Sequence, residues 1–160
     1  MTAITSSVAT TMVNAAFLQE VKDSNLPYWQ AIHDFKRLLA AAEDVQDQSP
    51  KLVKLLSDLR DAMALEFSLE ETYGYIDGTF ASTSLSAMKA SLAKWQHREL
   101  YLQLHEISES ADEAQYRGTI CQDFPRLATV CKEFLASLES HEKHESELIG
   151  YELGMGRFGS

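Results

Sequence analysis

The sequence has few of the residues that interrupt regular structure or crosslink a chain. Its 160 residues include only three prolines, seven glycines and two cysteines. Cys121 and Cys131 do not form a Cys-x-x-Cys pair, so neither a disulfide framework nor a thiolate zinc site is expected. The low cysteine content predicts a reducing, cytoplasmic location.

Basic residues are also scarce. The chain has 14 Lys and Arg against 24 Asp and Glu, which gives a formal net charge of -10. The basic residues are scattered along the sequence, and this argues against binding to nucleic acid or to an anionic membrane surface. There is no transmembrane run, and residues 1–18 lack the basic start and long apolar run of a signal peptide.

The pattern of apolar residues predicts an all-α fold. Apolar positions recur every three or four residues over long segments, with almost none of the alternation typical of strands. We expect an up-down-up-down antiparallel four-helix bundle, which at this length buries about 70% of the surface of the unfolded chain. Residues 1–25 are predicted to form an N-terminal arm or short helix, 26–153 the bundle and 154–160 a flexible tail.

Turn signals divide the bundle into four predicted helices. Pro27 suits the first helical position, and Asp77-Gly78 and Gly150 suit helix ends. Residues 111–124 form one long connection, either an extra helical turn or an irregular loop. The predicted helices span about 27–43, 50–75, 82–107 and 126–150.

Three of the five histidines lie on the apolar stripes of three different predicted helices, and the remaining stripe carries two glutamates. A polar side chain buried without a partner costs roughly 2–7 kcal/mol. Since these side chains would converge on one core, a metal centre explains all of them together. The side chains are His33, His97, His141, Glu66 and Glu70.

The spacing of these residues suits two metal ions. Residues at i and i+4 share one face of a helix, about 6 Å apart along its axis, and side chains from such pairs can reach ions about 3.5–4 Å apart. Mixed imidazole and carboxylate ligands favour iron or manganese, with zinc as a weaker alternative. Glu70 and Glu145 are the candidates for bridging. The expected metal ligands are His33, Glu66, Glu70, His97, His141 and Glu145.

Other histidines and other metal motifs fit less well. His144 is a further candidate ligand, whereas His105 lies about 12 Å beyond His97 along a helix and is expected at the surface or in packing. The chain has no Glu-x-x-His, no His-Glu-x-x-His and no Gly-x-Ser-x-Gly. These absences argue against a ferritin-like di-iron bundle, a zinc protease helix and a hydrolase elbow.

Four segments in order resemble the hemerythrin-like (HHE cation-binding) domains over residues 26–153. The resemblance implies a four-helix bundle with a non-haem di-iron site that binds oxygen, or uses it for sensing, redox chemistry or iron handling. It matches His33, Glu70 and His97 to ligands on the first three helices, and His141 with Glu145 to the pair on the last. The segments are Ile32–Leu39, Glu66–Glu71, Gln96–Leu100 and His141–Glu145.

The chain departs from this family at three places. Glu66 stands where the family usually has histidine, and Tyr101 stands where the oxygen carriers have a second histidine on the third helix. The last helix has His141-x-x-x-Glu145 in place of His-x-x-x-x-Asp. Tyr101 is therefore a candidate ligand or hydrogen-bond donor beside the metal, with core packing as the alternative. The departures argue against reversible oxygen carriage and leave metal binding intact.

The sequence thus predicts a di-iron protein that reacts with or senses O2, peroxide or nitric oxide. Two alternatives stay open at this point. The chain could be a metal-binding or iron-storage module without turnover, or a helical scaffold with a vestigial site.

Overall fold

The computed structural model describes residues 8–41, 49–80 and 85–158. The all-α class is confirmed, but these residues form five α-helices and one short pair of strands where four helices were expected. The elements in chain order are β1 (Val8–Val13), α1 (Ala15–Ser24), α2 (Leu26–Ala40), α3 (Ser49–Leu69), the π-helical turn η3 (Glu70–Gly74), β2 (Tyr75–Phe80), α4 (Leu85–Arg117) and α5 (Ile120–Phe158).

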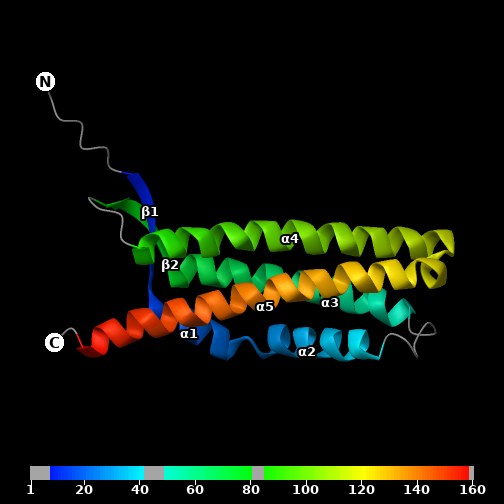
Figure 1. Cartoon of the computed structure of the whole chain (residues 1–160), viewed down its shortest axis with the longest axis horizontal. Helices are drawn as coiled ribbons and strands as arrows, with labels where there is room; N and C mark the ends of the chain where they lie inside the picture. The colour runs from blue at the N-terminus through cyan, green and yellow to red at the C-terminus, as the bar shows by residue number, and fades with distance from the viewer. Residues whose placement is uncertain (1–7, 42–48, 81–84, 159–160) are drawn as a thin grey trace, which may run out of the picture.

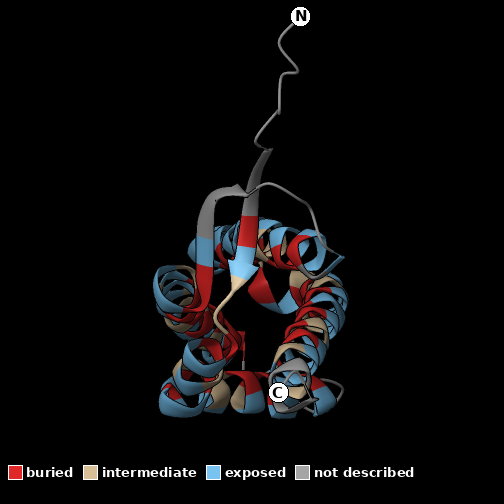
Figure 2. Ribbon diagram, turned by 90° about the vertical axis from the view of Figure 1, so that its left-hand side faces the viewer, coloured by how far each residue is buried: buried red, intermediate tan, exposed pale blue. Residues whose placement is uncertain are grey.

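Four of the helices form a closed ring. α2 packs on α3, α3 on α4, α4 on α5, and α5 again on α2 (Figure 1). Figure 2, along the long axis, shows that the buried residues face the interior of this ring. The fifth helix, α1, precedes α2 and packs against α5 and the turn η3. This gives one end of the bundle an extra helix, and the candidate site lies at that end.

α1 and α2 are separated at Asn25, whose backbone leaves the helical region at φ -99° and ψ 69°. Pro27 has no N–H to donate to the carbonyl of Asp23 four residues earlier, so an unbroken helix would lose a hydrogen bond here. The separate α1 is the short helix expected in residues 1–25, and residues 1–7 lie outside the described part. On α1, Ala15, Leu18 and Lys22 are buried.

The end of α3 differs from the prediction of a helix through Tyr75. After Leu69 the chain forms one π-helical turn, closed by a hydrogen bond from Tyr75 N–H to the carbonyl of Glu70. Such turns insert one extra residue and shift the helical phase. The chain then enters β2, which pairs antiparallel with β1 from Val8↔Phe80 to Val13↔Tyr75. The pattern of apolar residues did not predict either strand, because both are short and together form a single two-stranded ribbon.

The last two helices are longer than predicted. α4 does not end after Ile107, and residues 111–117 of the expected connection belong to it. Only Gly118, at φ +74°, and Thr119 separate it from α5. α5 begins at Ile120, before Pro125, which lies inside the helix. It continues through Gly150 to Phe158, so most of the expected flexible tail is helix, and residues 159–160 lie outside the described part.

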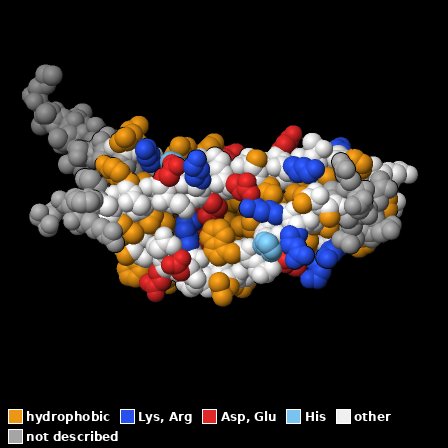
Figure 3. Space-filling model, turned by 60° about the horizontal axis from the view of Figure 1, so that its bottom comes forward, with side chains coloured by type: hydrophobic (Ala, Val, Ile, Leu, Met, Phe, Trp, Pro, Cys, Tyr) orange, Lys and Arg blue, Asp and Glu red, His pale blue; other side chains and the backbone are white. Residues whose placement is uncertain are grey.

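The surface of the bundle combines charge of both signs with apolar side chains. On the face to which α1, α2 and α5 contribute, acidic, basic and hydrophobic side chains are interspersed (Figure 3). Within the described ranges, no helix carries an apolar stretch long enough to cross a lipid bilayer.

Candidate metal centre

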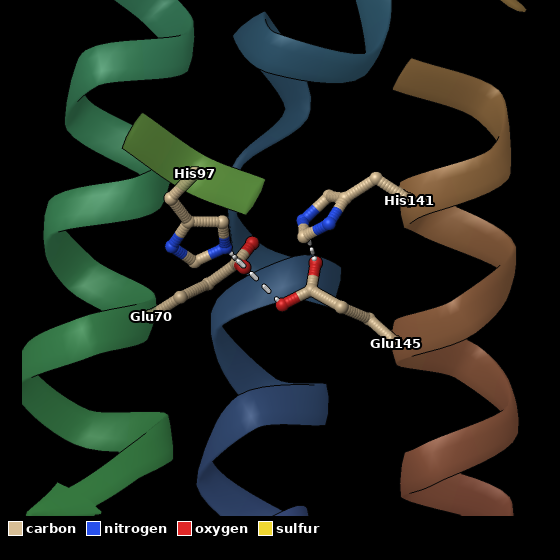
Figure 4. Close-up of side chains that lie close together, drawn as sticks. All are labelled: Glu70, His97, His141 and Glu145. Carbon is tan, nitrogen blue, oxygen red and sulfur yellow. Dashed lines mark hydrogen bonds and ion pairs between the residues drawn. The ribbon is translucent and has the colours of Figure 1, made fainter. Parts of the chain in front are cut away.

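Four of the expected ligands meet inside the bundle. Glu70 comes from η3, His97 from α4, and His141 with Glu145 from α5 (Figure 4). One potential ligand atom from each residue lies within 4.8 Å of the others. All four side chains are buried, with 3% exposure or less. The structure therefore places a compact set of two imidazoles and two carboxylates where the sequence predicted a metal.

The helical phase explains how these side chains come together. His141 and Glu145 are four residues apart on α5 and lie on its buried face with Leu138 and Leu148. The π-helical turn begins at Glu70, directly after the regular part of α3. π-helical turns occur frequently at functional sites. This turn carries Glu70 at its first residue and delivers Tyr75 at its end, so one local distortion positions two polar groups of the site.

The orientation of His141 leaves one ring nitrogen free for a metal. Its Nδ1–H donates to Gln96 Oε1 at 2.8 Å. That bond places the proton on Nδ1 and leaves the Nε2 lone pair facing the cluster. Nε2 lies 2.9 Å from Glu145 Oε1, but it is buried without a hydrogen-bond partner.

His97 is held by an aromatic ring and faces both carboxylates. Its ring stacks on Phe67, with 4.0 Å between centroids and 8° between planes. Its Nε2 lies 3.1 Å from Glu70 Oε1 and 3.3 Å from Glu145 Oε2. Burial alone would lower its pKa, but the nearby carboxylates of Glu145, Glu70 and then Glu71 raise it to about 11.

Lys22 brings a positive charge to the same place. It is 5% exposed, on α1, and its Nζ donates to Glu142 Oε2 at 2.7 Å, to Glu145 Oε1 at 2.9 Å and to Glu70 Oε2 at 3.4 Å. Burial would lower the pKa of Lys22, but the surrounding carboxylates, Glu145 foremost, raise it above its usual value. Lys22 is therefore a fixed cation among acidic side chains.

The two cluster carboxylates differ in their electrostatic surroundings. Burial and the neighbouring charge of Glu145 raise the pKa of Glu70 well above its usual value. Burial would act in the same way on Glu145, but the adjacent imidazoles of His141 and His97, with the charge of Lys22, hold its pKa well below the usual range. In the protein without metal, this favours a charged Glu145 and a protonated Glu70.

Two tyrosine hydroxyls outside the four-residue cluster donate hydrogen bonds to the carboxylates. Tyr75 O–H donates to Glu145 Oε2 at 2.5 Å, and Tyr28 O–H donates to Glu142 Oε1 at 2.7 Å. Burial and the charge of Glu145 raise the pKa of Tyr75, while burial and the charge of Glu142 raise that of Tyr28. Both phenols therefore stay protonated and act as hydrogen-bond donors.

Glu66 lies beside Glu70 and is also fully buried. Asn25 Nδ2 donates to its Oε1 at 3.0 Å, and its Oε2 has no hydrogen-bond partner. It is thus a neighbour of the four-residue cluster, while the prediction made it a member. The break between α1 and α2 supplies the amide that holds it.

The structure does not bring His33 into the cluster. Its side chain is exposed on α2 and lines a surface pocket with Trp29 and Glu139. His33 follows the buried Ile32 by one residue, which turns it about 100° away from the buried face of α2. The prediction that His33 faces the core is therefore wrong.

Tyr101 and the other histidines also lie outside the cluster. Tyr101 is 37% exposed, and its ring lies 6.1 Å from that of His105, centroid to centroid. It lies outside the core, where packing would have placed it, and it lines a surface pocket with His97 outside the four-residue cluster. His105 is exposed, and His144 is partly exposed with its Nε2 3.2 Å from the carbonyl of Lys89.

Sequence reasoning missed Lys22, Tyr75 and Asn25. One signal for Lys22 was present, since it follows Leu18 by four residues and Ala15 by seven and so continues an apolar stripe. No sequence signal marked Tyr75, because its position depends on the π-helical turn. Asn25 immediately precedes Leu26-Pro27, and this proline indicated that a helix starts here. Nothing in the sequence indicated that Asn25 contacts Glu66.

The acidic side chains exceed the cations available to pair with them. In the part of the chain that the structure describes, the ion-pair partners of Glu70, Glu142 and Glu145 near the site are Lys22 and the imidazoles, and Glu66 is held by the neutral amide of Asn25. Buried charges require pairing or a metal. Within the described residues, Glu70 Oε1 and His141 Nε2 are both buried without a hydrogen-bond partner, and both are potential ligand atoms. The donor set therefore fits a metal cation.

Comparison of the chain with models of known protein families gives no match, and comparisons with curated proteins and with solved structures give none either.

Proposed function

We propose that this chain is a metal-binding protein whose buried site, formed by Glu70, His97, His141 and Glu145, holds a divalent transition-metal ion. One observation carries the proposal. Glu70 Oε1 and His141 Nε2 converge in the bundle, are shielded from water and have no hydrogen-bond partner. A metal ion would satisfy both atoms at once.

The donor types favour iron or manganese. Two imidazole nitrogens and two carboxylate oxygens suit Fe(II) and Mn(II), with zinc as the weaker alternative. The hydrogen bond from His141 to Gln96 supports this role, because a histidine ligand usually donates its other N–H to such an acceptor. The resemblance to hemerythrin-like domains makes iron the first candidate. The residues outside the cluster hold the ligands in place and keep water out.

A surface pocket beside His97 supports reaction with a small molecule. It has a volume of about 420 Å³ and is lined by His97, Phe67, Glu71, Arg98 and Tyr101 among others. Of the four cluster residues, His97 is the one that lines this pocket. When bound, iron would supply redox chemistry toward O2, peroxide or nitric oxide, and Arg98 and Tyr101 line the approach.

A second candidate function is metal binding without turnover. The complete burial of Glu70 and Glu145 favours it, because neither side chain is exposed to solvent. A closed site of this kind retains a metal and restricts the access of substrates.

Metal loading of purified protein tests the proposal. The chelated protein is reloaded with Fe(II), Mn(II) or Zn(II), and bound metal per chain and the melting temperature are measured. We expect stoichiometric binding and a higher melting temperature, since a ligand that binds only the folded state adds about 3–4 kcal/mol at several hundred to a thousand times its Kd. His141→Ala should abolish loading, whereas His105→Ala, on the exposed side of α4, should load normally.

The proposal is supported if His141→Ala loses both the bound metal and the rise in melting temperature while His105→Ala keeps them. Failure of folded wild-type protein to bind any of the three metals, or full loading of His141→Ala, would contradict the proposal. Assays of ferrous oxidation and of peroxide consumption then separate a reactive centre from a binding module.

A further inference from the structure

The metal site is flanked by an ammonium group that shares its carboxylates. Glu70 turns Oε1 toward His97 Nε2 at 3.1 Å and Oε2 toward Lys22 Nζ at 3.4 Å. Glu145 Oε1 likewise lies 2.9 Å from both His141 Nε2 and Lys22 Nζ. Each carboxylate thus lies between the imidazole side of the cluster and the lysine, as a bridging ligand lies between two cations.

A third carboxylate completes the surroundings of this ammonium. Glu142 Oε2 is 2.7 Å from Lys22 Nζ, and its Oε1 accepts a hydrogen bond from Tyr28 at 2.7 Å. Within the described residues, the three hydrogen-bond acceptors of Lys22 Nζ are all carboxylate oxygens. Its surroundings are those of a hard cation bound by oxygen ligands.

The backbone holds Lys22 in this position. The carbonyl of Lys22 accepts a hydrogen bond from Trp29 Nε1 at 2.6 Å, and its Nζ lies 5.7 Å from the centroid of the Trp29 ring. α1 itself is fixed by a close approach of Leu18 to Gly74, in the same turn as Glu70. The ammonium is therefore part of the folded core.

We propose that Lys22 Nζ occupies the second cation position of this centre, so that the native chain binds one metal ion, and that removing the ammonium opens a carboxylate site for a second ion. This inference rests on the proposed function. It replaces the two-ion centre expected from sequence, which depended on His33. The second site would consist of Glu70, Glu142 and Glu145, with the first and last bridging the two ions.

The test counts Mn(II) ions per chain. Chelated full-length protein is titrated with Mn(II), with bound and free ion distinguished by electron paramagnetic resonance and total metal measured by elemental analysis. The proposal expects one ion in wild type, two in Lys22→Met and one in Lys22→Arg, which keeps a cation. Two ions bridged by carboxylates should also show magnetic exchange coupling, which wild type should lack.

A double variant locates the added ion. Lys22→Met/Glu142→Gln should return to one ion, because Glu142 lies outside the four-residue cluster and serves only the second position. Two ions in wild type, or one ion in folded Lys22→Met, would overturn the proposal. The wild-type count tests it even if Lys22→Met does not fold. A wild type that binds no ion would instead refute the proposed function, so the two failures are distinguishable.

Discussion

Phe67 lies face to face with His97, with ring centroids 4.0 Å apart and planes 8° from parallel. Phe67 is one residue after Glu66 and three before Glu70, so the end of α3 and the first residue of η3 together supply two buried carboxylates and the surface on which an imidazole rests. The ring also meets His141 edge to face, with centroids 5.6 Å apart. One apolar side chain therefore limits the rotation of both candidate histidine ligands.

Shortening this side chain should weaken metal binding. In Phe67→Leu the His97 ring loses its support, and we expect affinity for Mn(II) to fall about tenfold, the low end for changes beside metal ligands. Stability should fall by about 1–2 kcal/mol, as expected for a smaller core side chain. Phe134→Leu, also fully buried, is the matched control, with a similar loss of stability and unchanged affinity. Equal affinities of the two variants would argue against a role for the stack.

The hydrogen bond from His141 to Gln96 should set metal affinity without altering the fold. Gln96→Leu removes the acceptor of the Nδ1–H, so the proton is no longer fixed away from the metal. We expect affinity to fall by about 10- to 100-fold. Gln103→Leu, two helical turns further along α4, is the control and should bind as wild type does. The measurement is a competitive metal titration, and unchanged affinity in Gln96→Leu would show that the Nδ1–H needs no acceptor.

Gly74 should resist substitution by alanine. A Cβ there would lie 2.7 Å from Leu18 Cδ1 and 2.9 Å from Leu18 Cβ. Because the second of these atoms is fixed to the backbone, α1 must move, and we expect a loss of about 1–3 kcal/mol in the free energy of unfolding. Gly150→Ala is the control, since nothing lies within 4 Å of its Cβ and a helical glycine costs about 1 kcal/mol. Chemical denaturation should therefore show opposite signs for the two changes.

The two thiols should react at very different rates. Cys121 is exposed, whereas Cys131 is fully buried and its burial raises the pKa of its thiol to about 12. Since the thiolate is the reactive form, a colorimetric disulfide reagent should modify one thiol per chain quickly in native buffer and two in denaturant. Cys121→Ser should remove the fast phase. Rapid reaction of two thiols in the folded protein would contradict the buried position of Cys131.

The sequence was informative where regular helices carry the site. His97, His141 and Glu145 lie on unbroken helices, so their spacing predicted their shared burial. His33 was misplaced because it follows the buried Ile32 by one residue, which is enough to turn it away from the buried face of α2. The regular helical phase also ends after Leu69, where the π-helical turn begins.

Long-range contacts account for what the sequence could not predict. Lys22 meets its carboxylates from α1, a separate helix that ends at Ser24, and no sequence pattern showed how that helix would pack on α5 and η3. On the first part of α4, Ala87, Ala90 and Ala93 are buried, while the larger Met88 is exposed. Ala90 and Ala93 pack in one cluster with residues of α1, β2 and α5, contacts that the apolar pattern of a single helix does not reveal.

The separation of 123 positions between Lys22 and Glu145 has a consequence for the order of events during synthesis. At about 5–20 residues per second, the lysine leaves the peptidyl-transferase centre about 6–25 seconds before the glutamate is added. During that interval α1, α3 and α4 are synthesised while His141 and Glu145 are still missing. The four-residue cluster is complete only after α5 has been added, so a metal ion that needs all four side chains cannot bind to the shorter nascent chain.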